Sequence, residues 1–118
     1  MTVKRGDVVL LSMPFAQGGG SKIRPAVVVQ TDRNNARLNN TIVAAITRNI
    51  SRANLPTQLL VDPGTSAGKD SGLMAVSAVT CENLFTVGRN LIHRSIGRLS
   101  TDDMRQVSDC LRAALDIS

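Results

Sequence analysis

The chain has no tryptophan, no tyrosine and only two phenylalanines. This scarcity excludes most RNA-binding platforms that stack bases on aromatic rings. Two cysteines and one histidine are too few for a zinc ribbon, a disulfide framework or a nuclease built on a histidine pair. The longest uninterrupted apolar run, residues 42–46, is too short to span a bilayer, and no signal-peptide core follows Met1. We therefore expect a cytoplasmic protein with no membrane partner.

What the chain does have is enough apolar material for a core. Hydrophobic residues make up 42% of its 118 residues and charged residues 19%. This balance is typical of a folded globular domain rather than a disordered chain. No internal repeat and no linker interrupts the sequence, so we expect a single domain over residues 1–118.

The net charge of +5 is unevenly distributed. Between residues 8 and 61 the single acid is Asp32, whereas outside this window acids and bases balance. The bases inside the window are Lys22, Arg24, Arg33, Arg37, Arg48 and Arg52. The planar fork of arginine suits phosphate oxygens, which favours a polyanionic partner such as nucleic acid. The alternative is a solubilising surface, which +5 also fits.

Five short apolar segments predict β-strands, because they are rich in β-branched residues and too short for helices. They are residues 8–11, 26–29, 41–47, 56–61 and 77–87. Pro14 and Gly18–Gly20 predict a flexible loop between the first two strands, and residues 31–40 predict a loop with room for one helical turn.

The period of the sequence changes after residue 99. Ser100 is a good N-cap, and Asp102 and Asp103 stand in the first turn, where the helix dipole favours acids. The apolar residues that follow at helical spacing are Met104, Val107, Leu111, Ala114 and Leu115. The expected fold is therefore mainly β (α+β): a small, strongly bent antiparallel sheet or barrel with a C-terminal α-helix.

Five segments, in order, carry recognisable motifs. They are Lys-Arg-Gly-Asp at the start of 4–9, Arg-Pro within 22–29, a threonine ending 42–47, Glu-Asn within 80–87, and Gly-Arg within 96–100. Together they resemble the MazF/PemK (Kid-like) family of toxin endoribonucleases of type II toxin–antitoxin systems. The resemblance covers nearly the whole chain.

This resemblance implies an SH3-like β-barrel that forms homodimers and cuts single-stranded RNA at short sequences, without a metal ion or other cofactor. The products would carry a 2′,3′-cyclic phosphate and a free 5′-hydroxyl. The implied partners are mRNA and a cognate acidic antitoxin with a disordered tail, and contact with DNA would come only through the antitoxin.

The family's active-site pair corresponds to Arg24 and Thr47, and its carboxylate base to Glu82. The Arg24 guanidinium suits charge on the phosphorane but cannot act as a base. The Thr47 hydroxyl could bond a phosphate oxygen or the attacking 2′-hydroxyl, and Glu82 is ionised at neutral pH. The alternatives are an exposed salt-bridging arginine, an ordinary strand-end threonine and an outward-facing strand glutamate.

Other residues are expected to bind substrate along the RNA backbone. They are Lys22, Arg33, Arg37, Arg48, Arg52 and Asn83, and the loop at Gly18–Gly20 could close over RNA with Lys22. For each arginine alone, the alternative is a solvated surface position. Where some family members carry a serine, a loop histidine and a basic residue, this chain has Arg48, Gly18 and Thr80.

Two rival functions remain open at this stage. Sister toxins of the same fold bind DNA gyrase without catalysis through a C-terminal tail that contains tryptophan, which this chain lacks. An inactive RNA-binding relative is the other alternative. Cys81 and Cys110 are expected to be packed thiols and His93 a structural residue.

Overall fold

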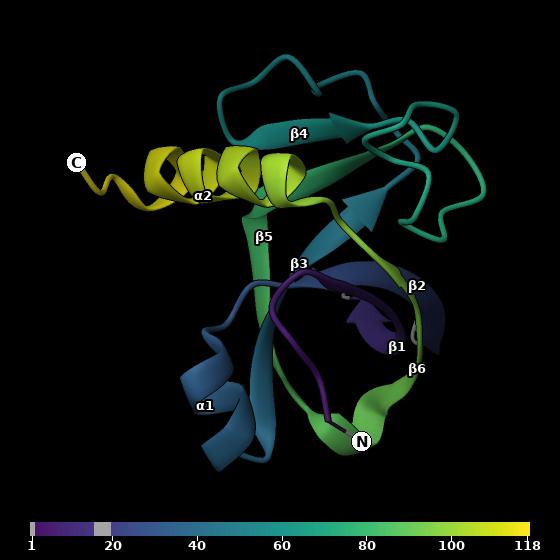
Figure 1. Ribbon diagram of the computed structural model, residues 1–118. Helices are drawn as coiled ribbons and strands as arrows, with labels where there is room; N and C mark the ends of the chain where they lie inside the picture. The colour runs from purple at the N-terminus through teal and green to yellow at the C-terminus, as the bar shows by residue number, and fades with distance from the viewer. Residues whose placement is uncertain (1, 16–19) are drawn as a thin grey trace.

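The computed structural model describes residues 2–15 and 20–118 (Figure 1). The elements in chain order are β1 (Asp7–Phe15), β2 (Gly20–Val28), α1 (Asp32–Arg37), β3 (Asn40–Thr47), β4 (Gln58–Val61), β5 (Ser77–Gly88), the 3-10 turn η1 (Arg89–Leu91), β6 (Ile92–Arg98) and α2 (Thr101–Leu115). Of the glycine loop that was predicted to be flexible, Gly18 and Gly19 lie outside the described residues, and Gly20 begins β2.

The strands form one antiparallel sheet in the order β4-β5-β3-β2-β1-β6. Figure 1 shows β1, β2 and β6 curling around the lower half of the molecule, while β3 and β5 run up to β4 beside α2. The predicted mainly β fold with a strongly bent antiparallel sheet and a C-terminal helix is confirmed. Within the described residues the edge strands are β4 and β6, so the sheet is open rather than a closed barrel.

The two faces of the bent sheet carry separate cores. The inner face buries Val3, Val9, Leu11, Met13, Ala26, Val28, Val43, Val87 and Ile92. The other face packs against α2 and buries Val8, Val27, Ala44, Ile46, Leu59, Val61, Val79 and Cys81 together with Leu99, Met104, Val107 and Cys110. Alternation along each strand therefore supplies both cores, and apolar burial on both faces holds the curvature.

Helix α2 begins where the sequence predicts. The Ser100 hydroxyl accepts a hydrogen bond from the Asp103 backbone amide at 3.1 Å, which caps the first turn. The predicted apolar face is correct for Met104 and Val107, but Leu115 is 53% exposed because the end of the helix projects past the sheet. No helix in the described part of the chain is both long and apolar enough to cross a membrane.

Strand β6 is absent from the prediction, which has five strands instead of six. Its residues are mostly exposed, and its pairing with β1 shifts register twice, so it shows neither an apolar run nor a clean alternation. Residues 31–40 were predicted as a loop with room for one helical turn, and the short helix α1 lies within them.

Strands β1 and β2 are longer than predicted, and Pro25 lies inside β2. Toward β3 the pairing of β2 begins only at Ala26. The missing N–H of Pro25 therefore leaves no gap in the β2–β3 ladder, and the strand continues through the proline.

Candidate active site

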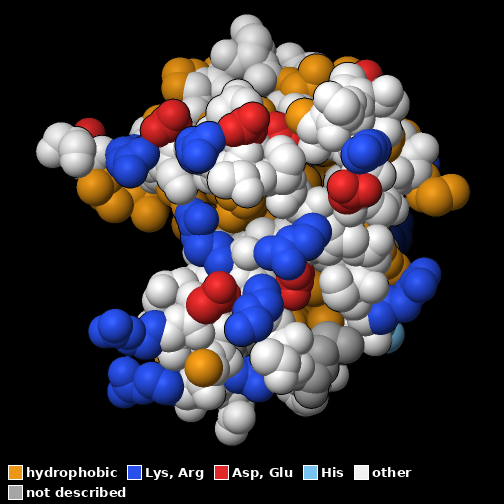
Figure 2. Space-filling view, viewed as in Figure 1, with side chains coloured by type: hydrophobic (Ala, Val, Ile, Leu, Met, Phe, Trp, Pro, Cys, Tyr) orange, Lys and Arg blue, Asp and Glu red, His pale blue; other side chains and the backbone are white. Residues whose placement is uncertain are grey.

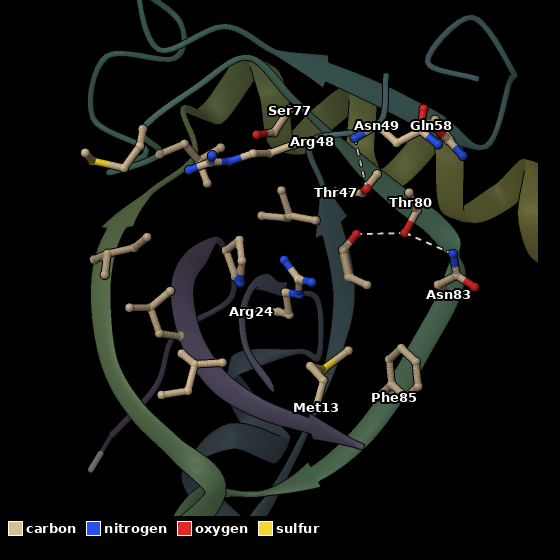
Figure 3. A pocket seen from close by; sticks show the side chains of 18 of the residues that line it. Met13, Arg24, Thr47, Arg48, Asn49, Gln58, Ser77, Thr80, Asn83 and Phe85 are labelled. Carbon is tan, nitrogen blue, oxygen red and sulfur yellow. Dashed lines mark hydrogen bonds between the residues drawn. The ribbon is translucent and has the colours of Figure 1, made fainter. Parts of the chain in front are cut away.

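A groove with a cavity volume of about 1040 Å³ lies at one end of the inner core. Its walls come from the middle of β2 and of β5, from the end of β3, from the segments that precede β4 and β5, and from a few residues of β1 and β6 (Figure 3). Gly72 lines it with a φ of +76°, and a side chain there would collide with the Ile96 carbonyl oxygen. Glycine thus lets the segment before β5 close against β6.

Strand register brings Arg24 and Thr47 together. Ala26 pairs with Ala45 and Val28 with Val43, and the same register continued by two residues sets Arg24 level with Thr47. Side chains two apart share a face, so Arg24 and Thr47 extend the inner face beyond the alanines into the groove. Figure 3 shows the Arg24 guanidinium in the middle of the groove and Thr47 on its wall.

The Thr47 hydroxyl oxygen is anchored by its own chain. It accepts a hydrogen bond from the backbone amide of Asn49 at 3.1 Å, in the turn that follows β3. A hydroxyl that accepts one bond keeps its proton for donation. The half-buried Thr47 side chain can therefore donate to an oxygen that lies in the groove.

A bulge in β5 exposes Glu82 and Asn83. On β3, Ala45 pairs with Thr80 but the neighbouring Ala44 pairs with Leu84, so residues 81–83 fall outside this ladder. The Thr80 hydroxyl donates to the Ala45 carbonyl at 2.7 Å and accepts from the Asn83 amide at 3.3 Å. Thr80 thus pins the bulge, and Glu82 and Asn83 reach the groove as exposed side chains.

The Glu82 carboxylate is held by a hydrogen bond and lies near a positive charge. Gln58 Nε2 donates to its Oε2 at 2.5 Å. Burial alone would raise the pKa of Glu82, but hydrogen bonds from Gln58, from its own backbone amide and from Thr57, with the charge of Arg52, outweigh burial. The pKa of Glu82 is therefore lower than usual. The carboxylate is ionised at neutral pH and is a weaker base than an ordinary glutamate.

The groove gathers most of the residues predicted from the sequence. The catalytic candidates Arg24, Thr47 and Glu82 all line it, and so do the substrate-binding candidates Arg48, Arg52 and Asn83. Lys22 is exposed on β2, two residues before Arg24, but it does not line the groove.

Arg33 and Arg37 do not belong to the groove. They lie on α1, which is tied to the start of β3 by a hydrogen bond from Thr41 Oγ1 to Asn35 Oδ1. Thr47 is at the far end of that strand, about 20 Å away along an extended chain. Figure 2 shows Lys and Arg side chains gathered over the lower half of the molecule, below α2. The predicted basic surface is thus wider than the groove.

Sequence reasoning missed Gln58 and the apolar part of the groove. Gln58 is only 9% exposed, at the start of β4, and nothing in its sequence context signals a polar partner. Met74 lines the groove with 88% of its surface exposed, and Ile23, with 56% exposed, lines it too. In the sequence, the one signal was a methionine that lies outside any periodic segment.

The remaining chemically active side chains are structural. His93 Nε2 and the Ser12 hydroxyl form a hydrogen bond at 2.9 Å between β6 and β1. Cys81 and Cys110 are both buried free thiols, as predicted, and burial raises the pKa of Cys81 to about 12. Among the residues that the structure describes, no three His, Cys, Asp or Glu side chains are grouped to hold a metal ion.

Comparison with known proteins gives a consistent result. Residues 4–115 match the family model described as PemK-like, MazF-like toxin of type II toxin–antitoxin system. The chain is 32% identical over 116 residues to Endoribonuclease EndoA of Bacillus subtilis, covering 98% of this chain and 96% of that protein.

Solved structures with the same fold include several complexes. One is an endoribonuclease in complex with its cognate antitoxin from a mycobacterial species, with a TM-score of 0.77, 19% identity, and coverage of 98% of this chain and 97% of that chain. Another is MazE-MazF from Deinococcus radiodurans, with a TM-score of 0.73, 19% identity and complete coverage of both chains.

Proposed function

Because the chain belongs to the PemK-like, MazF-like toxins of type II toxin–antitoxin systems, a family of endoribonucleases, we propose that its groove cuts single-stranded RNA at a short sequence without a metal ion. The whole of residues 1–118 would form the toxin domain. The observation that carries the proposal is the register of β2 on β3, which sets Arg24 level with Thr47 in a groove that Glu82 also lines.

The reaction begins with attack by the RNA 2′-hydroxyl on the adjacent phosphorus. Glu82 takes the proton of that hydroxyl, the bond between phosphorus and O2′ forms, and the bond between phosphorus and O5′ breaks. The products are a 2′,3′-cyclic phosphate and a 5′-hydroxyl, which takes its proton from water or from a protonated group in the groove. A carboxylate that is ionised at neutral pH is ready to accept the proton.

Arg24 stabilises the charge that develops on the phosphorane. Its fork can hold two non-bridging oxygens, and a donor aimed at developing charge is the largest single contribution in such reactions. The Thr47 hydroxyl, held by the Asn49 amide, donates to a phosphate oxygen or orients the attacking 2′-hydroxyl.

The rest of the groove would hold the RNA on either side of the cut. Arg48 and Arg52 are exposed beside the site and suit the neighbouring phosphates, and Asn83 can hydrogen-bond a base edge. Lys22, Arg33 and Arg37 lie outside the groove, so their role would be in drawing or holding more distant phosphates.

The proposed partners are a second copy of the chain and an acidic antitoxin. Leu115 and Ile117 are 53% and 56% exposed, and Figure 2 shows hydrophobic side chains along the underside of the projecting end of α2. A homodimer would cover this surface. Solved complexes of similar proteins with antitoxins support an antitoxin partner. The toxin would contact DNA only through this antitoxin. If the substrate is cellular mRNA, the protein would act in the cytoplasm.

The test is incubation of the purified protein with a long single-stranded RNA in the presence of EDTA. Discrete fragments that carry 2′,3′-cyclic phosphate and 5′-hydroxyl ends are expected. RNA binding without fragments would favour the inactive relative. Loss of supercoiling by gyrase in the presence of the protein, with intact RNA, would favour the gyrase-binding alternative.

A further inference from the structure

Gln58 is a buried polar side chain on the wall of the groove. It opens β4, pairs with Thr80 of β5 and has 9% of its surface exposed. Its Nε2 donates to Glu82 Oε2 at 2.5 Å. Its Oε1 is buried and has no hydrogen-bond partner among the described residues. The Nε2 donor of this carboxamide is thus bonded to one carboxylate, and its Oε1 acceptor is left unpaired.

The orientation of the carboxamide follows from Glu82. If the amide were turned over, Oε1 would face Glu82 Oε2, and two acceptors would meet with no proton between them. A buried acceptor without a partner is costly, and a leucine at this position would serve the apolar core without that cost. The hydrogen bond from Gln58 Nε2 to the Glu82 carboxylate therefore explains why a glutamine occupies this position.

The backbone fixes the two residues relative to one another. The Cys81 amide donates to the Thr57 carbonyl at 2.9 Å, so the residues that precede Gln58 and Glu82 are tied directly. Residues 81–83 are outside the β3–β5 ladder. On the bulge, where the ladder gives no support, the side chain of Gln58 restrains Glu82 from the neighbouring strand.

We propose that Gln58 is a positioning residue that holds the Glu82 carboxylate, in its ionised form and in one rotamer, against the reacting 2′-hydroxyl. This inference rests on the proposed function and assigns to β4 a part in the reaction. Gln58 is only 9% exposed, and its Nε2 already donates to Glu82. It acts through Glu82, so its loss should lower kcat and leave KM nearly unchanged.

Within the described residues, Glu82 shares the groove with Arg24, Arg48 and Arg52, and it interacts electrostatically with Arg52 and with two cysteines. Arg52 approaches from the segment between β3 and β4, Cys81 belongs to its own strand, and Cys110 approaches from α2. Burial raises the pKa of both thiols, so they stay neutral where the enzyme works. Removal of the Gln58 donor takes away a hydrogen bond that lowers the pKa of Glu82, while the charge of Arg52 remains. The pKa of Glu82 should then rise, and the acidic limb of the pH–rate profile should move to higher pH.

The experiment compares Gln58→Met, which keeps length and burial, with Gln58→Asn, which keeps polarity but falls one methylene short. Gln30→Met is the matched control. Gln30 is a buried glutamine whose amide bonds Asn35 and Asn40 instead of the site. Two quantities are measured: kcat and KM against pH on an RNA oligonucleotide, and the ¹³C titration of the Glu82 side-chain carboxyl without RNA.

For both Gln58 variants we expect kcat to fall about tenfold with KM within about twofold, and both the acidic limb and the Glu82 titration to move to higher pH. In a Glu82→Gln background the same substitutions should cost nothing further in kcat. Gln30→Met should lower thermal stability but leave kcat, KM and the Glu82 titration unchanged. One Gln58 variant that folds is sufficient for the test.

An unchanged Glu82 titration in the Gln58 variants would overturn the pairing. A titration that moves while the acidic limb stays fixed would overturn the positioning role. Absence of any RNA cleavage by the wild-type protein would instead refute the proposed function, and the RNA-free titration would still report whether Gln58 holds Glu82.

Discussion

Replacement of Arg24 by alanine tests the centre of the site. The side chain is exposed in the groove, and its strand contact, the pairing of Arg24 with Leu11, is made by the backbone and persists in the variant. The loss of the donor that faces the phosphorane should cost about 3 kcal/mol of transition-state stabilisation, which is a rate lower by about a hundredfold or more.

The assay is single-turnover cleavage of a labelled RNA oligonucleotide, with thermal unfolding followed by circular dichroism on the same samples. Arg24→Lys is the matched variant, because it keeps the charge and removes the two-pronged geometry. We expect lysine to restore little of the rate. Cleavage by Arg24→Ala near the wild-type rate, with an unchanged melting temperature, would remove Arg24 from the mechanism.

Three further outcomes are expected. Glu82→Gln should slow cleavage at neutral pH and abolish the acidic limb of the pH–rate profile. In the wild type this limb lies below the ordinary glutamate range, because the pKa of Glu82 is lowered and the base is lost only when the pH falls through that pKa. An unaltered pH–rate curve would leave Glu82 as a strand residue. Light scattering at micromolar concentration should give a dimer that Leu115→Glu dissociates, and a wild-type monomer would contradict the assignment of the exposed end of α2. The association rate with an acidic antitoxin peptide should fall as salt rises and fall further when Arg48 and Arg52 are both neutralised, with RNA competing; binding that ignores salt, these arginines and RNA would place the antitoxin elsewhere.

Elements whose residues follow a clear period could be predicted from the sequence. Strand β3 is a short apolar run bounded by threonines, and α2 follows the N-cap Ser100 and continues at helical spacing, so both were found close to their true bounds. Strand β6 could not be found, because an edge strand of mostly exposed residues with two register shifts has no period to detect. Strand β6 is held in place by its pairing with β1 and not by a pattern in its own residues.

The candidate site divides in the same way. Arg24, Thr47 and Glu82 were singled out through motifs that resemble those of the family, and all three line one groove. Thr47 and Glu82 lie within predicted strands, and Arg24 lies just before one. Gln58 was not found, because its contact with Glu82 depends on the pairing of β4 with β5 and on the bulge at residues 81–83. Contacts made by register and bulges are set by tertiary structure, and a single sequence carries no local sign of them.

The size of the residues on the inner face explains why the groove lies at this end of the sheet. Deeper in the core, β2 and β3 present Val28 and Val43 to one another, whereas one step nearer the groove the paired residues are Ala26 and Ala45. Small side chains leave space in a bent sheet that valines would fill. Ala45 lines the groove itself. The alanine pair therefore forms the bottom of the groove. Arg24 and Thr47, the next pair of positions on this face, are open to a ligand instead of being buried in the core.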